Sequence, residues 1–176
     1  MITTPRLQLL PCRPEHFAAM LQPDLPALAQ LLHVAPHLDW LQQDLVWEVV
    51  PQAAQFLTEH PEAADWWLYF FIHAEHQQLV GVGGFKGLPT HGTVELGYSI
   101  APHFRQQGYA TEATRGMIQF AFEHPEISQV LAHTLPSINY STQVLAKTGF
   151  TFQQVLEDPE DGLVWQWRLL KSDYSV

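Results

Sequence analysis

The residues with the clearest chemical potential lie between Thr93 and Glu112, where the sequence reads TVELGYSIAPHFRQQGYATE. Within this stretch, Arg105 to Ala110 has the pattern R-x-x-G-x-A, at the point where a strand-like run gives way to helical spacing. A turn of small residues that enters a helix leaves several backbone N–H groups without partners, and together with the helix dipole these groups bind anions such as phosphate. We therefore expect a phosphate site here, although an isolated pattern of this kind is also typical of a simple tight turn.

The elements that must position this loop follow from hydrophobic spacing. Runs rich in β-branched and aromatic residues predict strands at 6–10, 65–74, 79–85, 93–100, 130–134, 150–156 and 163–170. Apolar residues at helical spacing predict helices at 14–21, 25–32, 51–60 and 108–124, a helix that begins at Ser137 or Asn139 and is closed by Gly149, and one short helix within 34–51. This order of elements indicates an α+β fold with a mixed sheet of about seven strands flanked by helices.

Length and composition exclude several classes of protein. A chain of 176 residues with 47% hydrophobic residues is expected to form a single domain, 1–176, with a substantial core. It has no apolar run of about 20 residues and no signal peptide pattern, and its single cysteine, Cys12, excludes an internal disulfide, so we expect a cytoplasmic protein without a membrane segment. A net charge of −10 disfavours nucleic acid as a partner. The ten histidines include His33 and His37, but Pro36 separates them and no third ligand lies nearby, so no metal is expected.

Five pieces of the sequence, in order along the chain, together resemble the GNAT superfamily of acyl-CoA-dependent N-acetyltransferases. They are TPRLQL at 4–9, VELGY at 94–98, the R-x-x-G-x-A loop, ATEA at 110–113, and Asn139-x-Ser141 leading to KTGF at 147–150. Within that superfamily, the chain looks like the branch that includes the acetyltransferases of ribosomal-protein N-termini. The resemblance implies a sheet whose two central strands splay apart, with the pantetheine arm of acetyl-CoA entering the gap.

The resemblance also implies which residues bind acetyl-CoA. Backbone N–H groups of the loop, with Arg105 and the Thr111 hydroxyl, would hold the phosphates, while the end of the preceding strand and Asn139 would pair with pantetheine. Asn139 could equally cap a helix, and Lys147 could be a solvated lysine rather than a phosphate ligand. The expected cofactor-binding set is Tyr98, Ser99, Ile100, Arg105, Gln106, Gln107, Gly108, Tyr109, Ala110, Thr111, Asn139 and Lys147.

Two residues are candidates for catalysis. An alkyl amine with a pKa near about 10 must lose a proton before it attacks the thioester, and Glu95, in an otherwise uncharged strand, is the expected base. Many superfamily members use a tyrosine as general acid at the position held here by Leu145. Ser141 is the hydroxyl that the branch supplies near the sulfur, either as proton donor or as a helix cap. A solvated, non-catalytic Glu95 is the alternative for that position.

The expected reaction is therefore acetyl transfer from acetyl-CoA to a primary amine, by direct attack in a ternary complex. The acceptor is either a protein N-terminal α-amine or a small-molecule amine, and the protein is either a monomer or a homodimer. The segment from about 36 to 67, with Trp40, Trp47, Trp66 and Trp67 and the acids Asp39, Asp44 and Glu48, would line the acceptor side and suit a cation. The rival hypothesis is a regulatory module that binds CoA but has lost catalysis, consistent with Leu145.

Overall fold

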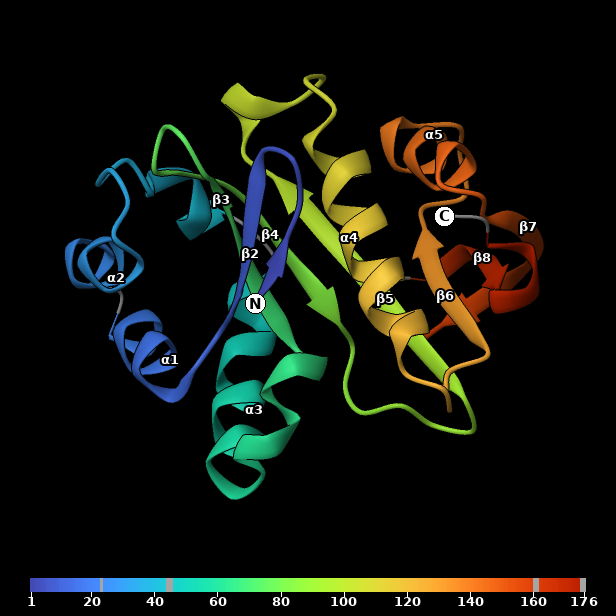
Figure 1. The fold of residues 1–176 in the computed structure, drawn as a ribbon, viewed down its shortest axis with the longest axis horizontal. Helices are drawn as coiled ribbons and strands as arrows, with labels where there is room; N and C mark the ends of the chain where they lie inside the picture. The colour runs from blue at the N-terminus through green and yellow to red at the C-terminus, as the bar shows by residue number, and fades with distance from the viewer. Residues whose placement is uncertain (23, 44–45, 160–161, 175–176) are drawn as a thin grey trace.

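An eight-stranded mixed sheet forms the centre of the molecule (Figure 1). The computed structural model describes residues 1–22, 24–43, 46–159 and 162–174, with the side chains of 42–49 left out. The spatial order of the strands is β1-β2-β3-β4-β5-β6-β8-β7, and the pairing is antiparallel except between β5 and β6. The strands are β1 (Ile2–Thr3), β2 (Leu7–Pro11), β3 (Leu68–His73), β4 (Gln78–Phe85), β5 (Thr93–Ile100), β6 (Gln129–Thr134), β7 (Thr151–Asp158) and β8 (Gly162–Leu170). The α+β prediction is confirmed, and the two-residue β1 supplies the strand beyond the seven expected.

Helices cover both faces of this sheet. They are α1 (Pro14–Leu21), α2 (Leu25–Leu32), α3 (Val46–Glu59), α4 (Tyr109–Glu123) and α5 (Tyr140–Lys147). In Figure 1, α4 lies across the middle of the sheet, with α5 beside it and α1, α2 and α3 grouped around the N-terminal strands. The two faces therefore have separate cores, and the strands must supply apolar side chains to both.

Strand β3 contributes buried side chains to both cores. Its buried side chains alternate, because successive residues of a strand point to opposite faces. Tyr69 and Phe71 belong to the cluster that contains Met117 of α4, whereas Phe70 and Ile72 belong to the cluster that contains the residues of α1 and α2. A strand buried on both faces is hydrophobic throughout, and this is why the run from 68 to 72 carries no charge.

Strands β5 and β6 separate partway along their length. Their parallel register runs from Thr93↔Gln129 to Glu95↔Leu131, although β5 continues to Ile100 and β6 to Thr134. A methyl group added at Gly97 would meet no heavy atom of the described part of the chain within 4 Å, so there is open space beside the strand at that point. This is the splay of the two central strands that the family resemblance implied.

Two local predictions were wrong. Asp65 and Trp66, predicted as the start of a strand, are instead the last residues of a 3-10 helix, Pro61–Trp66, and β3 begins at Leu68. Helix α3 begins at Val46 and takes Pro51 into its interior, whereas the sequence pattern placed its start at that proline. Proline favours a first helical turn, but tertiary packing overrides such local preferences. In the described part of the chain, no helix is both long and apolar enough to cross a membrane.

Candidate active site

The loop before α4 has the backbone shape that an anion site requires. Gln106 and Gly108 both lie in the left-handed region, at φ +61° and +83°, and Gly108 is the N-cap residue of the 15-residue helix α4. No side chain caps that helix end, so the first-turn N–H groups remain without a side-chain acceptor. Among the atoms that the structure describes, an added β-carbon at Gly108 would meet only Arg6 Nη2, at 3.4 Å. The backbone is therefore open to a ligand at this position.

A cavity of about 650 Å³ connects this loop to the end of β5 and the start of α5. Every predicted site residue lines it except Glu95 and Gln107; the lining set contains Tyr98, Ser99, Ile100, Arg105, Gln106, Gly108, Tyr109, Ala110, Thr111, Asn139, Ser141 and Lys147, together with Phe104, Leu135, Tyr140, Gln143 and Val144. Three stretches separated in sequence thus meet around one space. Its volume is within the range of about 300–1,000 Å³ typical of ligand pockets.

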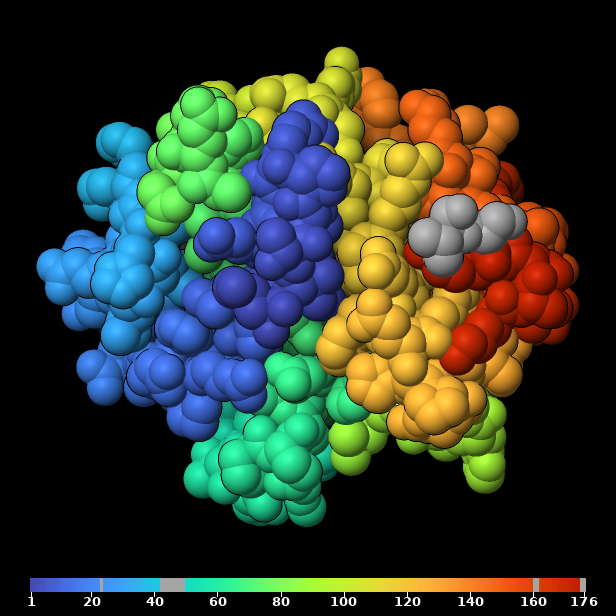
Figure 2. All heavy atoms as spheres, viewed as in Figure 1, coloured from blue at the N-terminus to red at the C-terminus, as the bar shows by residue number. Residues whose placement is uncertain are grey.

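A second hollow, of about 960 Å³, follows the outer side of α4 and shares Gly108, Thr111 and Lys147 with the first. In Figure 2, α4 (yellow) is flanked by the N-terminal hairpin (blue) on one side and by the C-terminal segments (orange and red) on the other. Of the eight Lys and Arg residues in the chain, four line the two hollows: Arg6, Arg105, Arg115 and Lys147. Half of the basic side chains of an acidic protein therefore surround the first turns of α4, as a polyanionic ligand would require.

The start of α5 brings Asn139 and Ser141 to the first cavity. The Asn139 Oδ1 atom accepts a hydrogen bond from the Thr142 N–H at 3.0 Å, so this residue is the N-cap of α5 as well as a lining residue. The Tyr98 hydroxyl donates to the Ser141 carbonyl oxygen at 3.4 Å. Burial raises the pKa of the Tyr98 phenol, and an interaction with the Ser141 side chain only partly offsets this effect. Leu145, the position at which the resemblance implied a tyrosine in many superfamily members, is buried in the core.

Two hydrogen bonds tie the loop to its neighbours. The Arg105 Nε atom donates to the Ile100 carbonyl oxygen at 3.0 Å, which holds this side chain along the end of β5. The Gln106 Nε2 atom donates to the Tyr140 hydroxyl at 3.0 Å and so connects the loop with the first residue of α5.

Glu95 lies on the opposite face of β5 from α4. Its neighbours Val94 and Leu96 are buried in the cluster beneath α4, so the alternation of the strand directs Glu95 the other way. Its Oε1 atom accepts from the Lys86 Nζ atom at 2.6 Å and lies 2.9 Å from the His133 Nδ1 atom. The second oxygen, Oε2, has no hydrogen-bond or ion-pair partner among the described residues. One oxygen is therefore fixed while the other is available.

The contact with His133 continues into a polar chain that sequence reasoning missed. Gln154 Nε2 donates to Gln166 Oε1 at 3.1 Å, which leaves the Gln166 amide nitrogen 3.2 Å from His133 Nε2. We therefore assign the proton of a neutral His133 to Nδ1, so that this atom donates to Glu95. Strand pairing places His133 opposite Gln166. The only signal in the sequence was a histidine near the end of the predicted strand 130–134, and it did not reveal the partner.

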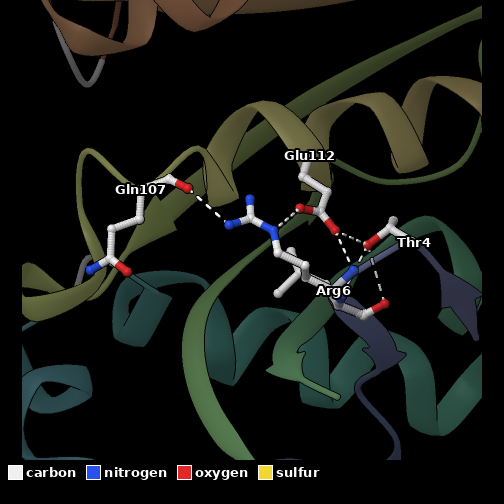
Figure 3. Close-up of polar contacts among 5 residues, drawn as sticks. Thr4, Arg6, Gln107 and Glu112 are labelled. Atoms are coloured by element: carbon white, nitrogen blue, oxygen red, sulfur yellow. Dashed lines mark hydrogen bonds and ion pairs between the residues drawn. The ribbon is translucent and has the colours of Figure 1, made fainter. Parts of the chain in front are cut away.

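The N-terminal hairpin is a second contribution that the site prediction missed (Figure 3). The Glu112 carboxylate accepts from the Thr4 hydroxyl and the Arg6 backbone N–H on Oε1, and from Arg6 Nε on Oε2, each at 2.7 Å. Burial alone would raise the pKa of Glu112, but these hydrogen bonds and the Arg6 charge together lower it. Arg6 Nη1 also donates to the Gln107 carbonyl oxygen at 3.1 Å.

The remaining candidates lie apart from this site. Cys12 is buried, and burial is the main reason that its thiol pKa is raised, as expected for an inert cysteine. No group of three or more His, Cys, Asp or Glu residues in the described ranges could hold a metal ion. Trp66 packs in the core against Phe85 and Phe120. The acceptor-side prediction for Asp44, Trp47 and Glu48 falls outside the described side chains.

Comparisons with known proteins agree with this geometry. A family model described as an acetyltransferase (GNAT) domain matches residues 6–151. An N-acetyltransferase of uncharacterised substrate, YjdG of Bacillus subtilis, is 25% identical over 64% of this chain and 67% of its own length, and p20 of Bacillus licheniformis is 25% identical over 61% and 64%. The aligned part thus spans about two thirds of these relatives.

Solved structures share the fold. An inferred ribosomal-protein-serine acetyltransferase from Vibrio cholerae superposes with a TM-score of 0.67 at 24% identity, covering 96% of each chain. RimL, a ribosomal L7/L12 α-N-protein acetyltransferase in complex with coenzyme A, gives a TM-score of 0.66 at 18% identity over 95% of each chain. At these identities, the likeness establishes the architecture. Because the family model covers most of the sequence, the chain belongs to the GNAT acetyltransferase family, whose acyl donor is acetyl-CoA.

Proposed function

We propose that this protein is an N-acetyltransferase that transfers the acetyl group of acetyl-CoA to a primary amine, by direct attack within a ternary complex. The observation that carries the proposal is the single cavity that joins the Gly108 loop, the C-terminal end of β5 and the start of α5. Family membership supplies the donor, and this cavity offers backbone N–H groups for phosphates at one end and a strand edge for the pantetheine amides at the other.

The donor would lie with its phosphates at the N-terminus of α4 and its thioester near Ser141 and Tyr98. Breaking the thioester releases a thiolate, which takes up a proton or is stabilised by a hydrogen-bond donor. In our proposal the Ser141 hydroxyl is that donor, because it lines the cavity and Leu145 has no polar group. Tyr98 lines the same space, but its one O–H already donates to the Ser141 carbonyl oxygen, and its raised pKa makes proton transfer less favourable.

The amine would approach from the other face of the gap, where Glu95 lies. We propose that Glu95 accepts the amine proton through Oε2, directly or through one water molecule, since Oε1 already accepts from Lys86 and His133. In this proposal, His133 is a positioning residue. Its Nδ1–H holds Oε1, and Gln166 fixes the ring, so the free oxygen keeps one orientation.

Two classes of acceptor fit this arrangement. RimL and the Vibrio cholerae structure are named for acetylation of ribosomal proteins, and another structure with the same fold, at a TM-score of 0.64, is a spermidine N-acetyltransferase chimera. Among the two, we favour a protein or peptide α-amine. Its pKa of about 8 leaves more neutral amine at pH 7 than an alkyl amine of pKa about 10, so a single carboxylate suffices as base.

The test is a screen of amine acceptors with purified protein and acetyl-CoA, following release of the CoA thiol and the mass of the product. The panel contains peptides with a free N-terminal serine, the same peptides with a blocked N-terminus, spermidine and free amino acids. We expect turnover that requires the free peptide α-amine. Turnover of spermidine alone would move the acceptor to the small-amine class. Tight CoA binding without turnover of any acceptor would instead support the regulatory module.

A further inference from the structure

Two of the motifs that carried the family resemblance meet in space although about a hundred positions separate them. The TPRLQL motif forms the turn between β1 and β2, and the ATEA motif forms the first turn of α4. Figure 3 shows Arg6 lying between Glu112 of the helix and Gln107 of the loop. This junction lies outside the cavity expected to hold pantetheine, and the proposed chemistry leaves it without a role.

The Arg6 guanidinium makes three separate contacts around Gly108. Its Nε atom pairs with Glu112, its Nη1 atom donates to the Gln107 carbonyl oxygen, and its carbon atom lies 4.4 Å from the centre of the Tyr109 ring. A planar guanidinium can make all three contacts at once because its donors point in fixed, different directions. The side chain is 42% exposed, however, and half-exposed ion pairs of this kind contribute little to stability.

The contact with Gln107 bears directly on the phosphate loop. The Gln107 carbonyl and the Gly108 N–H belong to one planar peptide, in which they point in opposite directions. Holding the oxygen toward Arg6 therefore directs the Gly108 N–H away from Arg6. Gln106 and Gly108, the residues on either side of Gln107, are both left-handed. Without the Arg6 contact, the peptide that joins Gln107 to Gly108 could rotate and present its oxygen where a phosphate must approach.

The contact between Arg6 and Glu112 reduces the repulsion between this carboxylate and a bound phosphate. A carboxylate in the first turn of α4 is favourable for the helix itself, but it repels a phosphate bound at the same helix end. The Arg6 charge neutralises Glu112, and the three hydrogen bonds keep both its oxygens turned toward the hairpin.

We propose that Arg6 is a positioning residue for acetyl-CoA. From the N-terminal hairpin, it sets the orientation of the Gln107–Gly108 peptide in the phosphate loop and neutralises the charge of Glu112. The inference rests on the proposed role of the loop in binding the pyrophosphate. It assigns a binding function to Thr4 and Arg6, which are far from that loop in sequence, and it makes the hairpin part of the cofactor site.

The experiment compares Arg6→Met and Arg6→Lys with wild type on two donors, acetyl-CoA and acetyl-pantetheine, which lacks the nucleotide and pyrophosphate. For Arg6→Met we expect kcat/KM for acetyl-CoA to fall about tenfold, the equivalent of about 1.4 kcal/mol, while kcat/KM for acetyl-pantetheine stays at the wild-type value. Arg6→Lys keeps the charge but cannot hold Glu112 and Gln107 together, so it should recover only part of the loss. Melting temperatures of all the variants should stay close to wild type.

Arg13→Met is the matched control, because Arg13 is equally exposed at 41% and its Nη2 atom pairs with Asp65 at 3.1 Å, in a different part of the molecule. Arg13→Met should leave kcat/KM unchanged for both acetyl-CoA and acetyl-pantetheine. Equal losses on both donors in Arg6→Met would reduce Arg6 to a structural residue, and full recovery by Arg6→Lys would show that only its charge matters; either result overturns the proposal.

Calorimetry with CoA compares wild type and the Arg6 variants by their dissociation constants, without requiring turnover. A tenfold weaker constant in Arg6→Met supports the proposal, and an unchanged constant overturns it. If wild type itself does not bind CoA, the proposed function fails, and this outcome is distinct from a failure at Arg6.

Discussion

Replacing Gly108 by valine tests the phosphate loop most directly. Gly108 has φ +83° and ψ −1°, and the left-handed conformation costs an L-residue about 1–2 kcal/mol. For a chain of this length, each 1 kcal/mol lowers the melting temperature by about 2–4 °C. The expected loss is therefore roughly 2–8 °C. The protein still folds, because Arg6 Nη2, at 3.4 Å, is the only described atom that the added β-carbon meets.

The effect on acetyl-CoA should be much larger than the effect on stability. The valine methyl groups would stand in the open space through which a phosphate reaches the N–H groups of α4. Hydrogen bonds to a charged group contribute about 1.5–3 kcal/mol each. Losing two of them costs at least about 3 kcal/mol, which corresponds to a loss of affinity of more than about 100-fold. Calorimetry with CoA gives the affinity, and a thermal melt without ligand gives the stability.

Gly162 provides the control for backbone strain. It also lies in the left-handed region, at φ +72°, and an added β-carbon there would meet no atom of the described residues within 4 Å. Gly162→Val should lower the melting temperature by a similar amount and leave CoA affinity unchanged. A Gly108→Val protein that binds CoA within about threefold of wild type, a difference of about 0.65 kcal/mol, would refute the assignment of this loop to the phosphates.

Three further predictions concern the reaction. Glu95→Gln should lower kcat at neutral pH without weakening acetyl-CoA binding. The loss of kcat should shrink as the pH rises towards the pKa of the acceptor amine, because the neutral amine then forms in solution. A higher KM for the amine with an unchanged kcat would instead show that Glu95 only attracts the cationic amine. Ser141→Ala should slow turnover by about 10²–10⁴-fold while CoA affinity holds, and a wild-type kcat would leave Ser141 as a lining residue of α5 only. His133→Leu should lower kcat, whereas His133→Asn keeps a donor near Glu95 and should retain most of it; equal losses in both variants would contradict a role through that hydrogen bond.

The loop and its two flanking elements were predictable because their signals are local. The predicted strand 93–100 has the same bounds as β5, and α4 begins within one residue of the predicted start. Here the apolar period changes from two to about 3.6 across a glycine that the turn requires. The cavity follows from this arrangement and from Asn139, whose side chain caps α5 whether or not it also contacts a ligand.

The partners of Glu95 and Glu112 could not be predicted in the same way. Both contacts depend on strand or hairpin register over long distances, from Glu95 to His133 and from Glu112 to Thr4 and Arg6. Register in a sheet is fixed by pairing, and one sequence gives no measure of which residues pair. The motif TPRLQL was recognisable in the sequence, but only the structure places its Thr4 and Arg6 against Glu112 of α4.

The alternation of β5 separates the two halves of the proposed reaction. Tyr98 points to the same face as Val94 and Leu96, toward α4 and the cavity that would hold the donor, while Glu95 points to the other face. Since the period of a strand is two, residues whose numbers differ by an odd number, such as Glu95 and Tyr98, point to opposite faces. The parallel pairing with β6 ends at Glu95, so the proposed base lies at the point where the gap opens. An amine held there could reach a thioester within the gap, and a one-residue shift of register would bury Glu95 beneath α4 and remove the acceptor side.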